Sequence, residues 1–333
     1  MATSLAEIRA KLQAQENRSQ GGQSQGDNAI YAHWNIPEGS SAKIRFLPDA
    51  NSKNDFFWVE RLMIRLPFAG IKGQADSKPV VVQVPCVEMY GDACPILAEV
   101  RTWFKDPGLE EMGRKYWKKK SYLFQGFVRE NPLADDKAPE NPIRRFVISP
   151  QIFNLIKAAL MDPELESMPT DYTAGLDFTV TKTSKGGYAD YSTSKWSRKE
   201  TALTAQEQAA IDSHGLYNLS DFLPKRPGEV ELKVIKEMFE ASVDGQAYDP
   251  DRWSQYFKPS GFTGGKGGDD AESAAPAPAA KAAPAPVQSA SPFVGDDEDD
   301  APVASAPVQA PAAKPSSQKA EDILAMIRNR SKQ

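Results

Sequence analysis

The stretch Ala42-Lys43-Ile44-Arg45-Phe46-Leu47-Pro48 alternates apolar and basic side chains and ends at a proline. A period of two is typical of a half-buried β-strand, and proline marks the end or the edge of such strands. Many short strands with few helices favour a barrel or sandwich over a doubly wound parallel sheet. Further strand candidates span 56–66, 80–84, 121–129, 144–148 and 177–182.

Helix and turn signals complete the core. The spacing of Ile152, Leu155 and Ile156 predicts a helix over 150–160, and a late helix is predicted over 227–243. Lys185-Gly186-Gly187 interrupts two strand-like segments and predicts a β-hairpin turn.

Composition divides the chain into four parts. Residues 1–28 combine a capping box at its start with a linker rich in Gln, Ser and Gly. Residues 29–262 form the predicted core, and the Ala/Pro-rich acidic stretch 263–319 is predicted to be disordered, because it has too little apolar surface to offset its ordering entropy. Residues 320–333 recover helical character.

The composition also excludes several classes of protein. No run of about eighteen apolar residues exists, and the first residues lack a secretory pattern, so we expect no membrane span and a cytoplasmic location. Two cysteines make no disulfide framework. The net charge is −5, but residues 267–333 carry most of it, whereas 112–129 hold six cations and no acid.

Three core segments interleave aromatic rings with cations, namely 114–122, 144–146 and 185–199. Unpaired nucleic acid offers phosphates to cations and base faces to flat rings, so this combination predicts single-strand binding with little sequence preference. Each segment alone fits core rings beside a solvated face, and Trp117 and Phe146 in particular suit a core, but three such segments together favour binding. The predicted stacking rings are Tyr116, Trp117, Tyr122, Phe146, Tyr188, Tyr191 and Trp196. The predicted phosphate contacts are Arg114, Lys115, Lys118, Lys119, Lys120, Arg144, Arg145, Lys185, Lys195 and Arg198.

A series of motifs in order carries a family resemblance. Together, several stretches resemble the helix-destabilising single-stranded DNA-binding proteins of T-even phages. They are 42–48, 86–95, 119–122 leading to 131–132, 145–146, 152–156, and 187–191 with 195–196. The resemblance implies a non-enzymatic protein with an OB-fold core, a small Greek-key β-barrel, that coats single-stranded DNA in phage replication, recombination and repair. It implies the cytoplasm of an infected bacterial host as its location, and adds Tyr90 as a further cleft ring.

Departures from the family pattern qualify the resemblance. Family members hold a structural zinc through one histidine and three cysteines, whereas here Cys86 and Cys94 remain and Leu97 stands at the third cysteine position. Two thiols do not complete a four-ligand site, so we expect no metal and no other cofactor. Apolar packing by Val84, Ile96 and Leu97 is predicted to hold this part instead.

The two ends of the chain carry the expected protein contacts. Both ends read Leu-Ala-x-Ile-Arg-x-basic, at 5–11 and 324–330. The first copy is predicted to mediate cooperative self-association, and the second to compete for the same groove until a partner captures it. Expected partners of the tail are a polymerase, a recombinase and a helicase loader. The self-association residues are Leu5, Ile8, Arg9 and Lys11, and the tail residues are Asp296, Asp297, Glu298, Asp299, Asp300, Leu324, Ile327 and Arg328.

Other functions stay open at the level of sequence. No carboxylate cluster in a catalytic motif and no phosphate-binding Gly-x-x-x-x-Gly-Lys loop occurs, which argues against a nuclease or an ATPase. An RNA-binding regulator uses the same chemistry, because stacking does not sense the sugar. A protein adaptor built on the same core is the remaining alternative.

Overall fold

The computed structural model describes residues 28–74, 76–134, 136 and 138–259. The described chain falls into two compact units, a division of 29–262 that the sequence did not predict. Unit 1 holds 28–59, 122–148 and 152–221, and unit 2 holds 60–121, 149–151 and 222–259.

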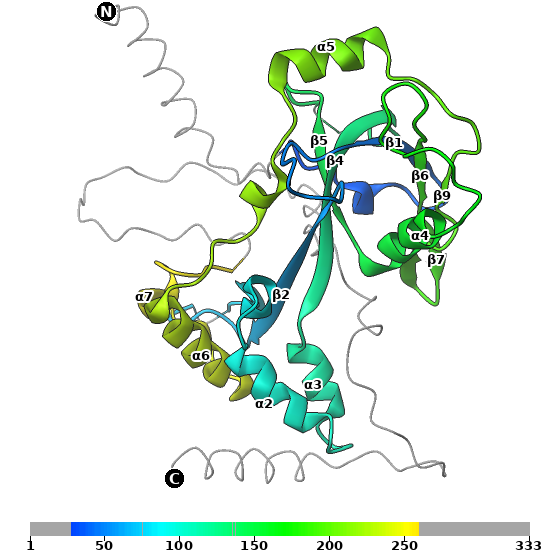
Figure 1. Cartoon of the computed structure of the whole chain (residues 1–333). Helices are drawn as coiled ribbons and strands as arrows, with labels where there is room; N and C mark the ends of the chain where they lie inside the picture. Colours follow the sequence, from blue (N-terminus) through cyan, green and yellow to red (C-terminus); the bar gives the residue numbers. More distant parts are fainter. Residues whose placement is uncertain (1–27, 75, 135, 137, 260–333) are drawn as a thin grey trace, which may run out of the picture. The chain divides into compact units, whose positions relative to one another are not determined.

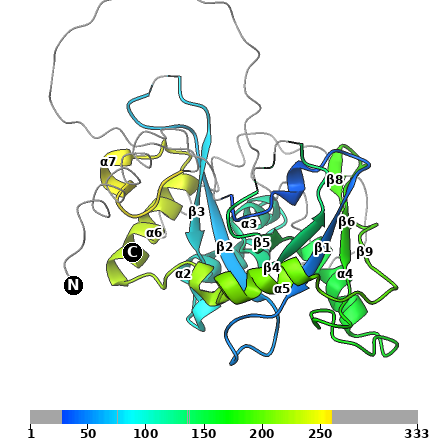
Figure 2. The ribbon, with the colours of Figure 1, turned by 90° about the horizontal axis from the view of Figure 1, so that it is seen from above.

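Unit 1 is built on an antiparallel sheet in which β1 pairs with β4 on one side and with β6 on the other (Figure 1). Viewed from above, β1 lies between these two strands (Figure 2). Next, β4 pairs with β5 and β6 pairs with β9, while β7 and β8 form a separate hairpin. The strands are β1 (Ser41–Leu47), β4 (Lys119–Glu130), β5 (Arg144–Ile148), β6 (Phe178–Thr181), β7 (Thr183–Lys185), β8 (Tyr188–Asp190) and β9 (Lys195–Trp196).

Aromatic side chains fill the core of unit 1, because alternate residues of the paired strands point to the same side. Phe46 of β1 contacts Phe124 of β4 and Phe178 of β6, with ring centroids 4.8 and 5.9 Å apart. At Gly126 a Cβ atom would lie 2.1 Å from the Arg45 carbonyl oxygen, so the approach of β1 to β4 requires glycine there. The helices that lie mainly in unit 1 are η1 (His33–Asn35), α4 (Pro150–Leu160), α5 (Ala205–His214) and η3 (Leu219–Phe222).

Unit 2 packs helices against an antiparallel pair of strands, β2 (Val59–Phe68) and β3 (Val80–Pro85). Every second residue of β2 from Leu62 to Phe68 is buried, which is the alternation expected of a strand with one covered face. Val84, Ile96 and Leu97 join this core, which confirms their predicted apolar packing. The helices are η2 (Val87–Tyr90), α2 (Pro95–Trp103), α3 (Glu110–Tyr116), α6 (Glu229–Val243) and α7 (Pro250–Trp253).

The prediction of a mainly β chain with accessory helices is confirmed. The strand predicted over 56–66 begins only at Val59, because 51–58 forms a loop held by side-chain hydrogen bonds. Helix α5 was not predicted, since it buries none of its residues and lacks an apolar stripe, although a capping box of Thr204 and Glu207 marks its start.

Several predictions concern parts of the chain outside the described residues. They are the N-terminal helix, the acidic stretch and the C-terminal helix, with their predicted self-association and partner contacts. The residues of these predictions are Leu5, Ile8, Arg9, Lys11, Asp296, Asp297, Glu298, Asp299, Asp300, Leu324, Ile327 and Arg328.

Within the described ranges, none of the helices combines the length and the hydrophobicity needed to span a bilayer.

Candidate nucleic-acid interface

Three rings predicted to stack on bases are core residues of unit 1. Phe146 is fully buried and packs edge-on against Tyr31 and Phe46, at 5.8 and 5.7 Å between centroids. Tyr122 is 7% exposed because Phe153 of α4 stacks on it at 3.5 Å. Tyr191 is 8% exposed, and its burial raises its pKa to about 12. The prediction that these rings are open for stacking is therefore wrong for this fold.

The rings predicted in unit 2 are covered as well. Tyr116 is buried and packs edge-on against Phe239, with its hydroxyl 3.0 Å from Ser242 Oγ. Trp117 is 5% exposed and lies edge-on to Phe104. Both rings were predicted to stack on bases, but α2, α3 and α6 supply the apolar partners that bury them, and Trp117 follows the core alternative instead.

Tyr90 and Trp196 are intermediate cases. The Tyr90 side chain is half-buried, and its hydroxyl donates a hydrogen bond to the Pro224 carbonyl. Trp196 of β9 is half-buried and packs edge-on against Phe178 at 5.0 Å. Both rings keep an exposed part, so base contact by either of them stays a prediction.

Two cations of β5 are held by partners within unit 1. Arg144 is 4% exposed, and its Nη1 and Nη2 atoms each donate to Asp136 at 2.9 Å. Such a bidentate pair is a strong, directional contact, and Arg144 lowers the pKa of Asp136. The prediction of a phosphate contact by Arg144 is therefore wrong in this structure. Arg145 is half-buried with its guanidinium 5.6 Å from the Tyr217 ring centroid.

The cations of 114–120 also have partners, in unit 2. Arg114 pairs with Glu110 at 2.8 Å, and Lys118 pairs with Glu88 at 2.8 Å. Burial alone would raise the pKa of Glu88, but the hydrogen bond and charge of Lys118 outweigh it and lower the pKa. Lys119 donates to the Arg114 carbonyl, Lys120 is half-buried, and Lys115 is exposed beside the Tyr116 ring.

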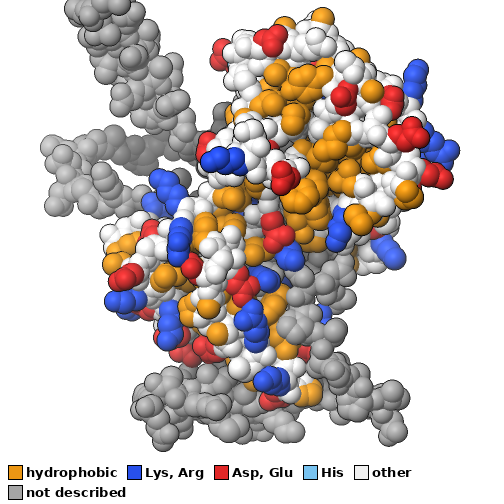
Figure 3. Space-filling model, viewed as in Figure 1, with side chains coloured by type: hydrophobic (Ala, Val, Ile, Leu, Met, Phe, Trp, Pro, Cys, Tyr) orange, Lys and Arg blue, Asp and Glu red, His pale blue; other side chains and the backbone are white. Residues whose placement is uncertain are grey.

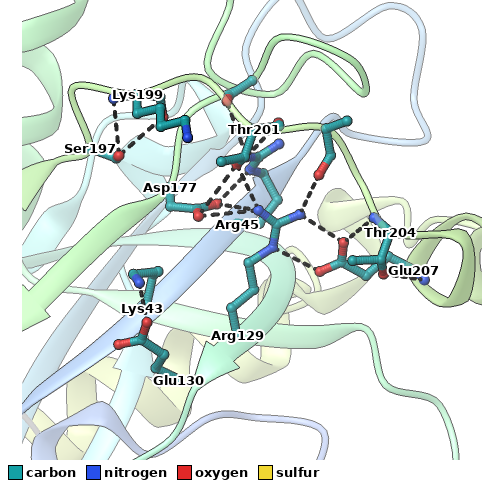
Figure 4. A network of polar contacts seen from close by, with 12 residues as sticks. Lys43, Arg45, Arg129, Glu130, Asp177, Ser197, Lys199, Thr201, Thr204 and Glu207 are labelled. Carbon is teal, nitrogen blue, oxygen red and sulfur yellow. Dashed lines mark hydrogen bonds and ion pairs between the residues drawn. The ribbon is translucent and has the colours of Figure 1, made fainter.

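Further arginines of unit 1 form a buried polar network (Figure 4). Arg45 is fully buried and its Nε atom donates to Asp177 at 2.9 Å. Arg129 donates to the same carboxylate at 2.8 Å and makes a bidentate pair with Glu207 of α5, at 2.9 and 2.7 Å. This network ties β1 and β4 to α5 and to 171–204, so these arginines serve the fold rather than a ligand.

The β7–β8 hairpin has a different character. Gly186 and Gly187 have φ angles of 62° and 85°, which only glycine adopts readily and which a tight hairpin turn needs. The turn places Lys185 opposite Tyr188 in register, and the Tyr188 side chain is 60% exposed. Lys185 is exposed too, so the hairpin presents a flat ring and a cation together to solvent.

The third predicted segment continues into an acidic cavity. Lys195 and Arg198 are exposed, as a phosphate contact requires. Arg198 and Trp196, however, line a cavity of about 630 Å³ whose other residues include acidic side chains. Carboxylates repel phosphate, so the acidic lining disfavours a phosphate backbone inside this cavity. The acidic residues are Asp162, Glu164, Glu166 and Glu200.

On the face shown in Figure 3, Lys and Arg side chains are interspersed with Asp and Glu and form no continuous basic surface. Hydrophobic side chains gather on the part of this face that belongs to unit 1. Sequence reasoning also missed an exposed ring: Phe56 is 57% exposed. It follows Asn51 and Asn54, whose side chains accept hydrogen bonds from nearby backbone N–H groups, and this Asn-rich turn signal could have indicated a loop there.

Cys86 and Cys94 were the candidate remnants of a metal site. Both are buried, and a hydrogen bond from Cys86 together with the backbone N–H groups of Ile96 and Leu97 lowers the pKa of the Cys94 thiol below its usual value. Leu97 is fully buried in the apolar core. Across the described ranges, no group of three or more His, Cys, Asp or Glu side chains is arranged to hold a metal ion.

Comparison of the chain with models of known protein families found no match, and comparison with curated proteins found none either.

Proposed function

We propose that this chain is a non-enzymatic protein that binds single-stranded DNA with little sequence preference. The observation that carries the proposal is the β7–β8 hairpin, which presents Tyr188 and Lys185 side by side in solvent. A flat ring suits an unpaired base and the adjacent ammonium suits a phosphate. A large exposed ring costs hydrophobic free energy in a monomer, which a ligand would recover.

An OB-type barrel is the finer architecture that we propose for unit 1. β1 pairs along both edges, with β4 and with β6, and its register with β4 shifts between Lys43 and Ile44. Register irregularities of this kind are common at barrel rims, and an OB-fold is a five-stranded, partly open Greek-key barrel.

The wider role follows from the family resemblance. The protein would coat unpaired strands during phage replication, recombination and repair, in the cytoplasm of the host. Because it would bind the single strand and not the duplex, it would shift the melting equilibrium of duplex DNA towards unpaired strands by mass action. Cooperative self-association and recruitment of replication and recombination proteins are assigned to the two ends of the chain.

A salt series of binding to a dT oligomer and to a duplex of the same length tests the proposal. Tyr188→Ala should weaken single-strand binding by about 1–3 kcal/mol and leave the salt slope unchanged, because it removes stacking but no charge. An RNA oligomer of equal length separates DNA preference from the RNA alternative. Absence of salt-dependent binding to either nucleic acid would favour the adaptor instead.

A further inference from the structure

The loop between β1 and β2 exposes a second aromatic ring. The Phe56 side chain is 57% exposed, in contrast to the neighbouring Phe57, which is 3% exposed and part of the core of unit 1. The sequence predicted this ring within a strand, and it lies outside the β7–β8 hairpin.

Side-chain hydrogen bonds brace the loop in this conformation. Asn54 Oδ1 accepts from the Phe56 backbone N–H at 3.1 Å, and Asn54 Nδ2 donates to the Trp58 carbonyl at 3.1 Å and to Asp49 Oδ2 at 2.8 Å. Such turns of Asn and Asp fix the local backbone. The exposed position of Phe56 is therefore built by the loop and is already organised before a ligand arrives.

Trp58 supports the exposed ring from behind. The centroids of Phe56 and Trp58 are 4.7 Å apart, with an angle of 32° between the rings. Trp58 itself stacks on Phe124 at 5.7 Å and lies edge-on to Phe153 at 5.3 Å. A series of rings therefore runs from the core to the surface, with Phe56 at its outer end.

Charge near the ring favours a nucleic-acid ligand over an apolar partner. Lys53 is exposed in the same loop, and among the described residues it makes no salt bridge. The neighbouring Asp55 is exposed as well, so the electrostatic share of binding at this loop should be modest. A flat, braced ring and an exposed cation in one loop fit an unpaired base and its phosphate.

We propose that Phe56, backed by Trp58 and accompanied by Lys53, is a second stacking position for an unpaired base of single-stranded DNA. This inference rests on the proposed function. The loop after β1 and the β7–β8 hairpin, labelled β7 in Figure 1 and β8 in Figure 2, lie on different sides of unit 1 in both views. Phe56 therefore marks a position separate from the hairpin.

Titration of a fluorescent dT oligomer at fixed salt tests the position with a graded series at Phe56. Phe56→Ala and Phe56→Leu should weaken binding about 5- to 150-fold, because both remove the flat ring, whereas Phe56→Tyr should bind like the wild type. Met161→Ala is the matched control, since Met161 is a 76% exposed apolar residue of the same unit. Unchanged thermal unfolding of each variant shows that the fold is intact.

The outcomes separate this inference from the proposed function. If the wild type binds the oligomer and Tyr188→Ala weakens it, but Phe56→Ala binds normally, the inference fails and the function stands. If Phe56→Leu binds like the wild type, apolar contact rather than stacking is responsible and the inference also fails. A wild type that does not bind single strands overturns both, and loss of self-association in Phe56→Ala with unchanged DNA affinity identifies a protein contact instead.

Discussion

The paired strands β4 and β5 and the β7–β8 hairpin carry the same kinds of side chain, rings beside cations, yet unit 1 uses them in opposite ways. In β4 and β5, Tyr122 and Phe146 are core rings and Arg144 is held by Asp136. In the hairpin, Tyr188 and Lys185 are exposed. The difference shows that ring-and-cation composition indicates a binding surface only where no distant segment covers it.

Phe146→Ala gives the sharpest test of the buried side of this comparison. The change should lower the free energy of unfolding by about 3–5 kcal/mol, because it leaves a cavity beside Tyr31 and Phe46. Urea denaturation measures it. A variant of wild-type stability that had lost only DNA affinity would show instead that Phe146 is a binding ring.

Asp177→Ala tests whether the arginines near β4 are structural. The change should cost about 3 kcal/mol of unfolding free energy, because Arg45 then keeps a buried charge without its carboxylate. Glu207 still neutralises Arg129 and limits the loss. Denaturation curves of the variant and of Lys43→Ala, a surface ion-pair control, make the measurement. Equal stability of the two variants would contradict a structural role for the network.

His33 should make the free energy of unfolding depend on pH. It is 2% exposed and lies edge-on to Tyr191, which follows strand β8. Burial lowers its pKa to about 4, so the unfolded chain takes up a proton first as the pH falls. Stability should therefore drop by about 3 kcal/mol between pH 6.5 and 4. Denaturation at several pH values measures the slope, and His33→Gln should remove it. An unchanged slope in that variant would assign the effect to other groups.

Lys185→Ala should have the smallest effect and concerns the exposed side of the comparison. Loss of one phosphate contact should reduce the salt slope of single-strand binding by about 0.7, with no change in stability. Lys118→Ala is the contrasting variant, because Lys118 is paired with Glu88. A larger slope change in Lys118→Ala than in Lys185→Ala would reverse the assignment of the two cations.

The sequence by itself determined the elements whose signals are local. The alternation of 42–47, the apolar spacing of 150–160 and the Gly186-Gly187 turn gave β1, α4 and the β7–β8 hairpin, because backbone propensity and periodicity act over a few residues. The same signals did not settle exposure, since Tyr188 and Tyr191 were predicted alike as stacking rings and only Tyr188 is exposed.

Only the tertiary structure decided which of the predicted rings and cations are exposed to a ligand. Alternation gives a strand two faces but does not say which face a distant segment covers. Phe146 is covered by Tyr31, and Arg129 is paired with Asp177 and Glu207, contacts that span many residues of chain. Burial is a long-range property, because it depends on apolar area and partner charges brought together by the fold, and this is why the predicted rings of β4 and β5 lie in the core.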